Sequence, residues 1–339
     1  MNLFVFDTSQ VLPPRAADPE RMALGMERWQ AAATECGDPK TLKIHQAIVG
    51  DPGARRLAEA VFGNSPYLSM CMIGAVEFAC EIFAQGPDHM FAALIGDVRN
   101  ISPGDGEVGK LLRVAKKKAA LCIALADIAG FWPLEKITAA LSEFADLAIS
   151  TAAAQALRIA AARGDIELVD PEHPESGSGL VILGMGKLGG RELNYSSDVD
   201  LIVLFDPDLV KTGDPDNLQT AFVRLTRTLV QVLEDHTTDG YVFRTDLRLR
   251  PDPGATPLAI SVLAAETYYE SIGQNWERAA MIKARPVAGD VQAGAAFLKW
   301  LTPFIWRKNL DFAAISDIHS IKRQINAQRG GSGISIPGH

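Results

Sequence analysis

The chain has 339 residues, of which 47% are hydrophobic and 22% are charged, so it is long enough to bury a sizeable core and to form two domains. Its formal net charge is -8. Binding to duplex DNA or RNA requires a basic face that neutralises backbone phosphates, so this acidic balance argues against a nucleic-acid partner.

The cysteines and the N-terminus indicate the compartment. The four cysteines lack the spacing of a metal site, which predicts free, buried thiols in a reducing compartment. The first residues contain no basic segment followed by a long apolar stretch, and no apolar run reaches the length expected of a membrane span. We therefore expect a cytoplasmic protein without a membrane partner. The cysteines are Cys36, Cys71, Cys80 and Cys122.

The first half of the chain is predicted to form a helical domain over residues 1–165. This half is rich in alanine, leucine and charged residues, and its apolar residues recur at helical spacing. Lys116, Lys117 and Lys118 are expected on a solvated helix face. Residues 166–178 contain prolines and glycines that predict a linker. The predicted helices cover residues 21–35, 54–62, 72–84, 107–129 and 133–163.

The second half alternates strands and helices, which predicts an α+β core over residues 179–310. The fold class expected for the whole chain is therefore α+β, with a helical N-terminal domain followed by a mixed sheet flanked by helices. Residues 311–339 are predicted to form a closing helix, over 312–329, and a mobile tail. Within the core we predict strands at 180–183 and 198–205, helices at 217–236, 264–272 and 275–281, and extended chain at 282–287.

A glycine-rich turn follows the first core strand. The apolar residues 180–183 run into Gly-Met-Gly-Lys-Leu-Gly-Gly over residues 184–190. Glycine lets the backbone turn tightly and present its N–H groups to an anion, normally a phosphate. Lys187 is either a phosphate ligand or an exposed loop lysine. It is not a Walker lysine, because Leu188 follows instead of serine or threonine.

Two aspartates, Asp198 and Asp200, lie at the start of the next apolar run. On a strand, residues two apart point to the same face, so both carboxylates are expected to project together. Two like charges held close together are costly unless a cation lies between them, and oxygen ligands favour Mg²⁺. The alternative is a solvated strand end with incidental acids, but the glycine turn before the pair argues against it.

A third aspartate, Asp246, lies in the run over residues 241–251. If this run is a strand, alternation places Arg244, Asp246, Arg248 and Arg250 on one face. Asp246 would then complete a three-carboxylate metal site, with Arg248 and Arg250 as forks for phosphate oxygens. Arg250 directly precedes a proline, so bracing of the strand end is the alternative for that residue.

A dinucleotide-binding site is the rival interpretation of the glycine turn. Gly184, Gly186 and Gly189 have the spacing of that fingerprint, and Asp206 ends the next strand where a ribose-binding acid is expected. Such a unit needs a full crossover helix between its strands, and residues 191–197 are too few to form one. It would also leave the three aspartates unexplained.

These motifs together resemble a known family. Residues 184–202 read Gly-x-Gly-Lys-Leu-Gly-Gly-Arg-Glu-Leu-Asn-Tyr-Ser-Ser-Asp-x-Asp-Leu-Ile, and residues 243–251 read Phe-Arg-x-Asp-Leu-Arg-Leu-Arg-Pro. The combination resembles the DNA polymerase β-like nucleotidyltransferase core of glutamine synthetase adenylyltransferase/adenylyl-removing enzymes. Further similarity lies at residues 62–66, 268–270, 274–278 and 283–290, so the resemblance covers most of the chain.

The resemblance implies a function. Members of this family carry two such cores. The motif Asn-Tyr-Ser-Ser over residues 194–197 resembles that of the N-terminal core, which removes AMP from glutamine synthetase. The chain has one core, so we expect it to be the N-terminal portion of a longer enzyme. Two Mg²⁺ would flank the α-phosphate of an adenylylated tyrosine, orthophosphate would attack it, and ADP would be released. The predicted catalytic and metal-binding residues are Asp198, Asp200 and Asp246, and the predicted phosphate- or nucleotide-binding residues are Gly184, Gly186, Lys187, Gly189, Gly190, Ser197, Arg248 and Arg250.

Two alternatives stay open at this point. One is the forward reaction, transfer of AMP from ATP to a protein tyrosine, because the same metal geometry serves either direction. The other is a non-catalytic regulatory module that binds glutamine synthetase or a PII-type signal protein through its helical half. For Lys283 and Arg285, a solvated face and a substrate contact are equally compatible with the sequence.

Overall fold

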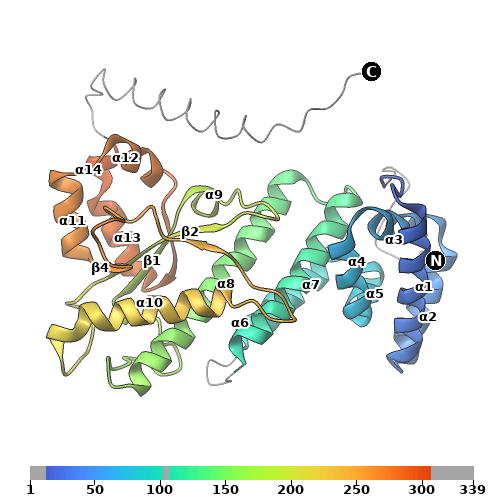
Figure 1. Cartoon of the computed structure of the whole chain (residues 1–339), viewed down its shortest axis with the longest axis horizontal. Helices are drawn as coiled ribbons and strands as arrows, with labels where there is room; N and C mark the ends of the chain where they lie inside the picture. The colour runs from blue at the N-terminus through green and yellow to red at the C-terminus, as the bar shows by residue number, and fades with distance from the viewer. Residues whose placement is uncertain (1–12, 102–106, 307–339) are drawn as a thin grey trace. The chain divides into compact units, whose positions relative to one another are not determined.

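The computed structural model describes residues 13–101 and 107–306 (Figure 1). Its contacts divide the chain into two units. The first unit comprises Met1–Arg158, Arg191–Asp198 and Thr228–Arg244, and the second comprises Ile159–Gly190, Val199–Arg227 and Thr245–His339. The predicted fold class, helices followed by a mixed sheet flanked by helices, is confirmed. The predicted helix over residues 312–329 lies outside the described residues.

Several helices of the first unit begin at a proline that follows a capping residue. Asp18, Asp38, Asp51 and Ser65 each precede a proline, and each side chain accepts hydrogen bonds from backbone N–H groups in the first helical turn. Such a cap satisfies donors that have no partner within the helix, and proline loses nothing at the first helical position. The helices are α1 (Pro19–Glu35), α2 (Pro39–Gly50), α3 (Pro52–Asn64), α4 (Pro66–Gly74), α5 (Val76–Gln85), α6 (Pro87–Arg99), α7 (Val108–Ile128) and α8 (Leu134–Ala162), whose last turn belongs to the second unit.

The helical prediction was incomplete in three places. Residues 72–84 are not one helix, because the chain bends by 94° between α4 and α5. Gly74, a poor helix former, ends α4, and Ala75 leaves helical geometry with φ -130° and ψ 50°. Helices α2 and α6 were not predicted, and each begins at a proline. The same proline is compatible with a first helical turn.

Helix α8 corrects the prediction that no apolar run is long enough to span a membrane. It has 29 residues and passes that test by length and composition. However, 67% of its apolar window is buried inside the protein, as in the core helix of a soluble protein. Helices α4 and α5 pass only when they are counted together, and the sharp bend separates them. These helices are therefore weak support for a membrane location.

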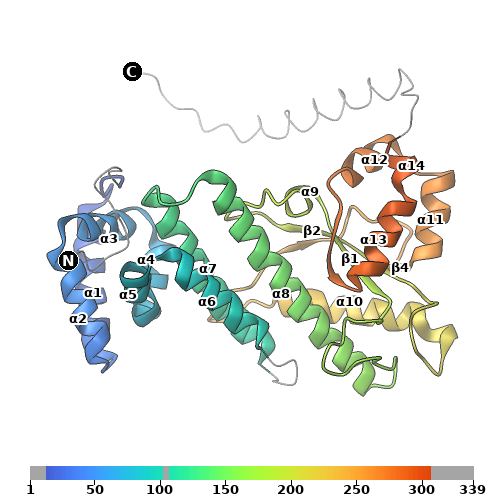
Figure 2. The ribbon, with the colours of Figure 1, turned by 180° about the vertical axis from the view of Figure 1, so that it is seen from behind.

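The second unit contains a five-stranded mixed sheet (Figures 1 and 2). Its path is β3-β2-β1-β5, with β4 also paired to β2. Strand β1 is antiparallel to β2 and β5, whereas β2 is parallel to β3 and β4. The strands are β1 (Leu180–Gly184), β2 (Val199–Phe205), β3 (Thr245–Asp246), β4 (Ala259–Ser261) and β5 (Arg285–Gly289).

Helices cover both faces of the sheet. Successive side chains of a strand point to opposite faces, so the apolar strands need a covering layer on each face. On one face, Val181, Leu183, Ile202 and Leu204 form a buried cluster with residues of the C-terminal helices, among them Tyr269. On the other face, Phe205 stacks on Phe222 of α10 with ring centroids 4.6 Å apart. The remaining elements are α9 (Gly186–Gly189), the short 3-10 helix η1 (Pro215–Asn217), α10 (Leu218–Glu234), α11 (Val262–Ser271), α12 (Asn275–Met281), α13 (Val291–Trp300) and α14 (Thr302–Ile305).

The predicted strand over residues 241–251 was mostly wrong. Only Thr245–Asp246 forms strand β3. Asp246 Oδ1 accepts a hydrogen bond from the backbone N–H of Arg248, and the N–H of Arg250 is donated to the carbonyl of Leu247. An aspartate that captures the N–H two residues later forms a turn that competes with the strand ladder. Strand alternation therefore does not extend to Arg248 and Arg250.

The four cysteines are free thiols, as predicted, and all except Cys36 are buried. Burial raises the pKa of Cys80 and of Cys122 to about 12, because the thiolate is disfavoured away from water. These thiols therefore act as small apolar core side chains, and not as nucleophiles.

His45 generates a testable prediction about pH. It is fully buried on α2, its ring meets Trp29 edge-on at 4.4 Å, and neither ring nitrogen has a hydrogen-bond partner. Burial lowers the pKa of His45 below 6.5, so the unfolded state binds the extra proton more readily than the folded state. The stability contributed by the neutral ring is thus present above pH 6.5 and is lost as the pH falls below it.

We expect the free energy of unfolding of His45→Leu, measured by urea denaturation between pH 7.5 and pH 5, to fall less with acidification than that of the wild type. His89→Leu, at an exposed position on α6, is the matched control and should keep the wild-type slope. Equal slopes for the wild type and His45→Leu would contradict the assignment.

Candidate active site

The site begins with two aspartates on neighbouring parallel strands. Asp200, the second residue of β2, pairs in register with Asp246, the last residue of β3. Side chains of paired residues on neighbouring strands point to the same face, so the two carboxylates lie side by side. Both side chains are partly exposed. The structure therefore brings together two of the three predicted acids.

The glycine turn lies against the first of these acids. Gly186 has φ +53°, and a Cβ atom at this position would lie 2.8 Å from Asp200 Oδ2. The N–H of Met185 is donated to the Asp200 carbonyl at 2.9 Å. Glycine is needed at residue 186 both for the left-handed backbone and for the close approach of the carboxylate. The predicted association of the turn with the Asp-x-Asp motif is thus present in the structure.

The turn forms a single short helix, α9, in which two backbone N–H groups donate to carbonyls of the same segment. The N–H of Gly189 is donated to the Met185 carbonyl, and the N–H of Gly190 to the Gly186 carbonyl. Arg285, on β5, donates to the carbonyls of Leu188 at 3.0 Å and Gly189 at 3.4 Å. The arginine therefore supports the turn from the neighbouring strand, a role that the sequence left undecided. The N–H groups of Gly189 and Gly190 are thus used within α9, and a phosphate cradle at the turn stays a prediction.

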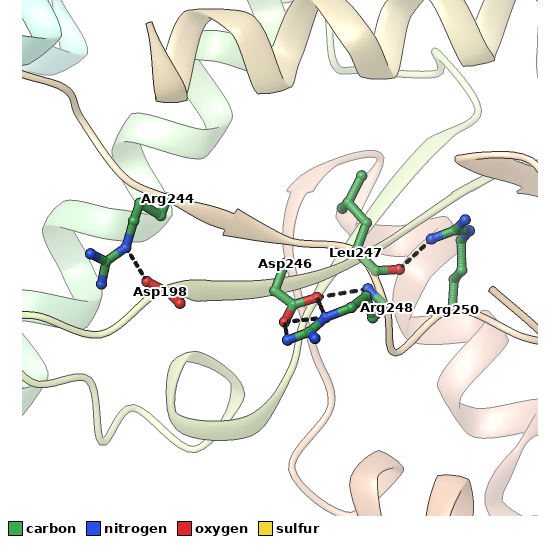
Figure 3. A network of polar contacts seen from close by, with 6 residues as sticks. All are labelled: Asp198, Arg244, Asp246, Leu247, Arg248 and Arg250. Atoms are coloured by element: carbon green, nitrogen blue, oxygen red, sulfur yellow. Dashed lines mark hydrogen bonds and ion pairs between the residues drawn. The ribbon is translucent and has the colours of Figure 1, made fainter. Parts of the chain in front are cut away.

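Asp246 is held by Arg248. The Arg248 guanidinium donates Nε to both carboxylate oxygens at 3.0 Å and Nη2 to Oδ2 at 2.5 Å (Figure 3). These hydrogen bonds, opposed by partial burial, hold the pKa of Asp246 below its usual value. The Arg248 side chain is 84% exposed, against 18% for Asp246. A cation that is anchored at one end and open to solvent is well placed to meet an incoming anion.

Asp198 directly precedes β2 and belongs to the first unit, where it pairs with Arg244. Arg244 Nε lies 2.5 Å from Asp198 Oδ1 (Figure 3). Arg244 Nη2 also donates to the Ser196 carbonyl at 3.1 Å. The neighbouring Ser197 donates its hydroxyl to Asn194 Oδ1 at 2.5 Å. Strand alternation predicted Arg244 on the same face as Asp246 but indicated no role for it. Its spacing of two residues from Asp246 was the available signal.

Arg250 and Lys187 have different surroundings. Arg250 donates to the carbonyl of Leu247 at 2.8 Å (Figure 3). It also donates to the carbonyls of Pro253 at 2.9 Å and Thr256 at 3.3 Å. This favours bracing of the turn after β3, the alternative that the sequence allowed for Arg250. Lys187 is exposed on α9, so its role as a phosphate ligand stays a prediction.

The acidic residues of the site offer some of the ligands that a divalent cation requires. Within the described ranges, no group of three or more His, Cys, Asp or Glu side chains is arranged to hold a metal ion. Asp200 and Asp246 nevertheless offer the hard oxygen donors that Mg²⁺ prefers, and Gly186 leaves space at Asp200 Oδ2 that a side chain would fill. Two of the carboxylates therefore fit a divalent cation, and the full three-carboxylate site stays a prediction.

Gly189 tests whether the turn depends on its glycines. A Cβ atom there would overlap the Lys283 carbonyl oxygen and lie 2.6 Å from the Gly184 carbonyl oxygen, and both are backbone atoms that cannot rotate away. We expect Gly189→Ala to lower the free energy of unfolding by about 1–3 kcal/mol, as overpacking does elsewhere. Gly213→Ala, where no atom lies within 4 Å of the added Cβ, should change it by less than about 0.5 kcal/mol. Urea denaturation followed by circular dichroism measures both. Equal stability of the two variants would show that the turn tolerates a side chain.

Several known proteins are similar to this chain. The family model described as glutamate-ammonia ligase adenylyltransferase matches residues 56–300. Three relatives are each named bifunctional glutamine synthetase adenylyltransferase/adenylyl-removing enzyme. The protein from Bradyrhizobium diazoefficiens is 46% identical over 297 residues, which cover 87% of this chain and 30% of the relative. The protein from Agrobacterium fabrum is 48% identical over 300 residues, 86% of this chain and 30% of the relative. The protein from Rhodopseudomonas palustris strain TIE-1 is 42% identical over 329 residues, 96% of this chain and 33% of the relative.

This chain thus spans about a third of the length of the curated relatives that it matches. The matched region includes the glycine turn, the Asp-x-Asp motif and Asp246. The chain belongs to the glutamate-ammonia ligase adenylyltransferase family.

Proposed function

We propose that this chain removes AMP from an adenylylated tyrosine of glutamine synthetase by phosphorolysis, with release of ADP. The observation that carries the proposal is the in-register pair of Asp200 and Asp246 beside the Gly186 turn. The names of the relatives, which include both an adenylyltransferase and an adenylyl-removing activity, support the substrate. A cytoplasmic location is part of the proposal, because free thiols suit a reducing compartment.

The acids are assigned to cation binding. Asp200 and Asp246, together with Asp198, would hold Mg²⁺. The cation would supply Lewis-acid polarisation of a phosphoryl oxygen and offset negative charge there. Arg244 and Arg248 now pair with two of these carboxylates, so each arginine would exchange its partner when the site is occupied. The arginines thus keep the acids in place without the cation.

The reaction needs little acid–base chemistry from the protein. An oxygen of orthophosphate forms a bond to the α-phosphorus of the tyrosine-linked AMP as the bond to the tyrosyl oxygen breaks. Phosphate is already an oxyanion, so no general base is required. Arg248 would meet its charge, and the N–H groups of residues 186–188 would hold its oxygens. The tyrosyl oxygen takes up a proton from solvent after it leaves.

Formation of ADP tests the proposal. Adenylylated glutamine synthetase, Mg²⁺ and phosphate should yield ADP in the presence of this chain, and labelled ATP should transfer little label to unmodified glutamine synthetase. Asp200→Asn should lower the rate by at least about a hundredfold with the fold intact, because a cation ligand loses its charge. Asp208→Asn, at an exposed turn position after β2, is the matched control and should keep the wild-type rate.

Three results would contradict this proposal. Full activity of Asp200→Asn would remove the carboxylates from the reaction. Efficient labelling from ATP without phosphate-dependent release would favour the forward reaction. Binding of glutamine synthetase or of a PII-type protein without either activity would favour the non-catalytic module.

The two arginines after β3 should differ in their contribution. Arg248→Ala removes an exposed cation that pairs with Asp246, so it should weaken the phosphate dependence of ADP formation by about tenfold to a hundredfold, since a charge-assisted contact is worth about 1.5–3 kcal/mol. Its effect on the free energy of unfolding should stay below about 1 kcal/mol, as for other exposed ion pairs. Arg250→Ala should instead lower the melting temperature, because three carbonyls each lose the side-chain hydrogen bond from Arg250. Steady-state kinetics at varied phosphate and thermal melts of both variants separate these effects. If Arg248→Ala left the phosphate dependence unchanged, the turn would be the main phosphate ligand.

A further inference from the structure

The first unit contains a cavity of about 670 Å³ that the proposed reaction does not use. Its walls come from α4, α7 and α8 and from the segments 195–197 and 236–244, all within the first unit. Tyr67, Tyr195 and Tyr241 line it, and each of these rings is at least 36% exposed. Phe144 and Phe243, which are buried, complete an aromatic wall. This volume and lining are typical of a site for a small organic molecule.

Lys116 is the distinctive polar group of the cavity. Its ammonium lies 3.7 Å from the ring centroid of Phe243 and 5.7 Å from that of Phe144. The prediction that Lys116, Lys117 and Lys118 form a solvated face was therefore wrong for Lys116, which faces the cavity wall. In the described part of the chain no carboxylate forms an ion pair with it. Burial lowers the pKa of Lys116 to about 7, which is the expected response of a cation that lacks an anionic partner.

The other charged groups of the cavity already have partners. Lys117 pairs with Asp239 at 2.9 Å, and Asp127 accepts a hydrogen bond from the Tyr195 hydroxyl at 2.9 Å. Arg244 pairs with Asp198. Among the described cations of the lining, Lys116 therefore differs from Lys117 and Arg244 in having no carboxylate partner. A cation in such a position favours an anionic ligand.

We propose that this cavity binds a small aromatic organic anion, whose ring packs against the tyrosine and phenylalanine side chains and whose anionic group pairs with Lys116. An inorganic anion alone would leave the aromatic walls without a partner, and a neutral aromatic molecule would leave the ammonium without one. Both halves of the ligand are thus required by the lining. The inference concerns the first unit alone and does not rest on the proposed reaction.

Two fluorescent probes that differ only by a sulfonate test this proposal. 1-Anilinonaphthalene-8-sulfonate carries an anionic group on an aromatic body, and N-phenyl-1-naphthylamine is the same body without it. We expect the sulfonate to bind at one site per chain at pH 6.5. Lys116→Met should weaken its affinity by at least about tenfold, the usual loss for a charge-assisted contact, and leave the affinity of the neutral probe unchanged.

Lys118→Met is the matched control. Lys118 lies on the same helix with its ammonium 5.4 Å from the Phe78 ring centroid, but it does not line the cavity. This variant should bind both probes as the wild type does. Lys116→Arg, which keeps the charge, should retain binding of the sulfonate. Circular dichroism spectra verify that each variant is folded.

Chemical labelling of the wild type provides a test that needs no variant. Acetylation by acetic anhydride, followed by mass spectrometry, should modify Lys116 less in the presence of the sulfonate probe and leave Lys118 unaffected. Equal loss of both probes in Lys116→Met would mean that the lysine only supports the wall, and would overturn the proposal. Unchanged affinity of the sulfonate in Lys116→Met, or no protection of Lys116 in the wild type, would overturn it as well.

Discussion

The repulsion between two neighbouring carboxylates is the constraint on which the candidate site depends. Asp200 and Asp246 are paired in register on parallel strands, so the sheet ladder itself fixes their separation. Like charges held this close are stable only with a positive group beside them. In the protein alone, Arg248 supplies that charge to Asp246, and in the proposed reaction a divalent cation would take over part of this role.

This constraint explains several features nearby. The turn at Gly186 has no side chain because one would collide with the Asp200 carboxylate. Arg285 binds the carbonyls of the same turn and so ties it to β5. Strand β3 ends at Asp246 because its carboxylate accepts the backbone N–H of Arg248, which forms a turn. Short elements around the acids thus follow from local hydrogen bonds, while the buried apolar strands β1 and β2 provide the rigid support.

The first unit shows a different use of charge. Lys116 and Arg244 are both cations near aromatic or acidic partners, yet only Arg244 has a carboxylate. An ion pair at a surface contributes little stability, whereas a half-buried ammonium without an anionic partner is destabilising. The aromatic face of Phe243 offsets part of that cost for Lys116. The part of the cost that the ring does not offset is our reason for expecting an anionic ligand in the cavity.

The sequence by itself determined the fold class, most long helices and the strands that carry the glycine turn and Asp200, because these depend on local periodicity and on glycine and proline chemistry. It also identified Asp200 and Asp246 as members of one site, and the register of β2 and β3 agrees. Tertiary structure alone decided the length of β3, the partners of Arg248, Arg250 and Arg285, and the exposure of Lys116. Each of these depends on which backbone carbonyl, carboxylate or ring lies nearby in space. Three consecutive lysines on α7 are alike in sequence, and only the tertiary structure places the ammonium of Lys116 against the rings of Phe144 and Phe243.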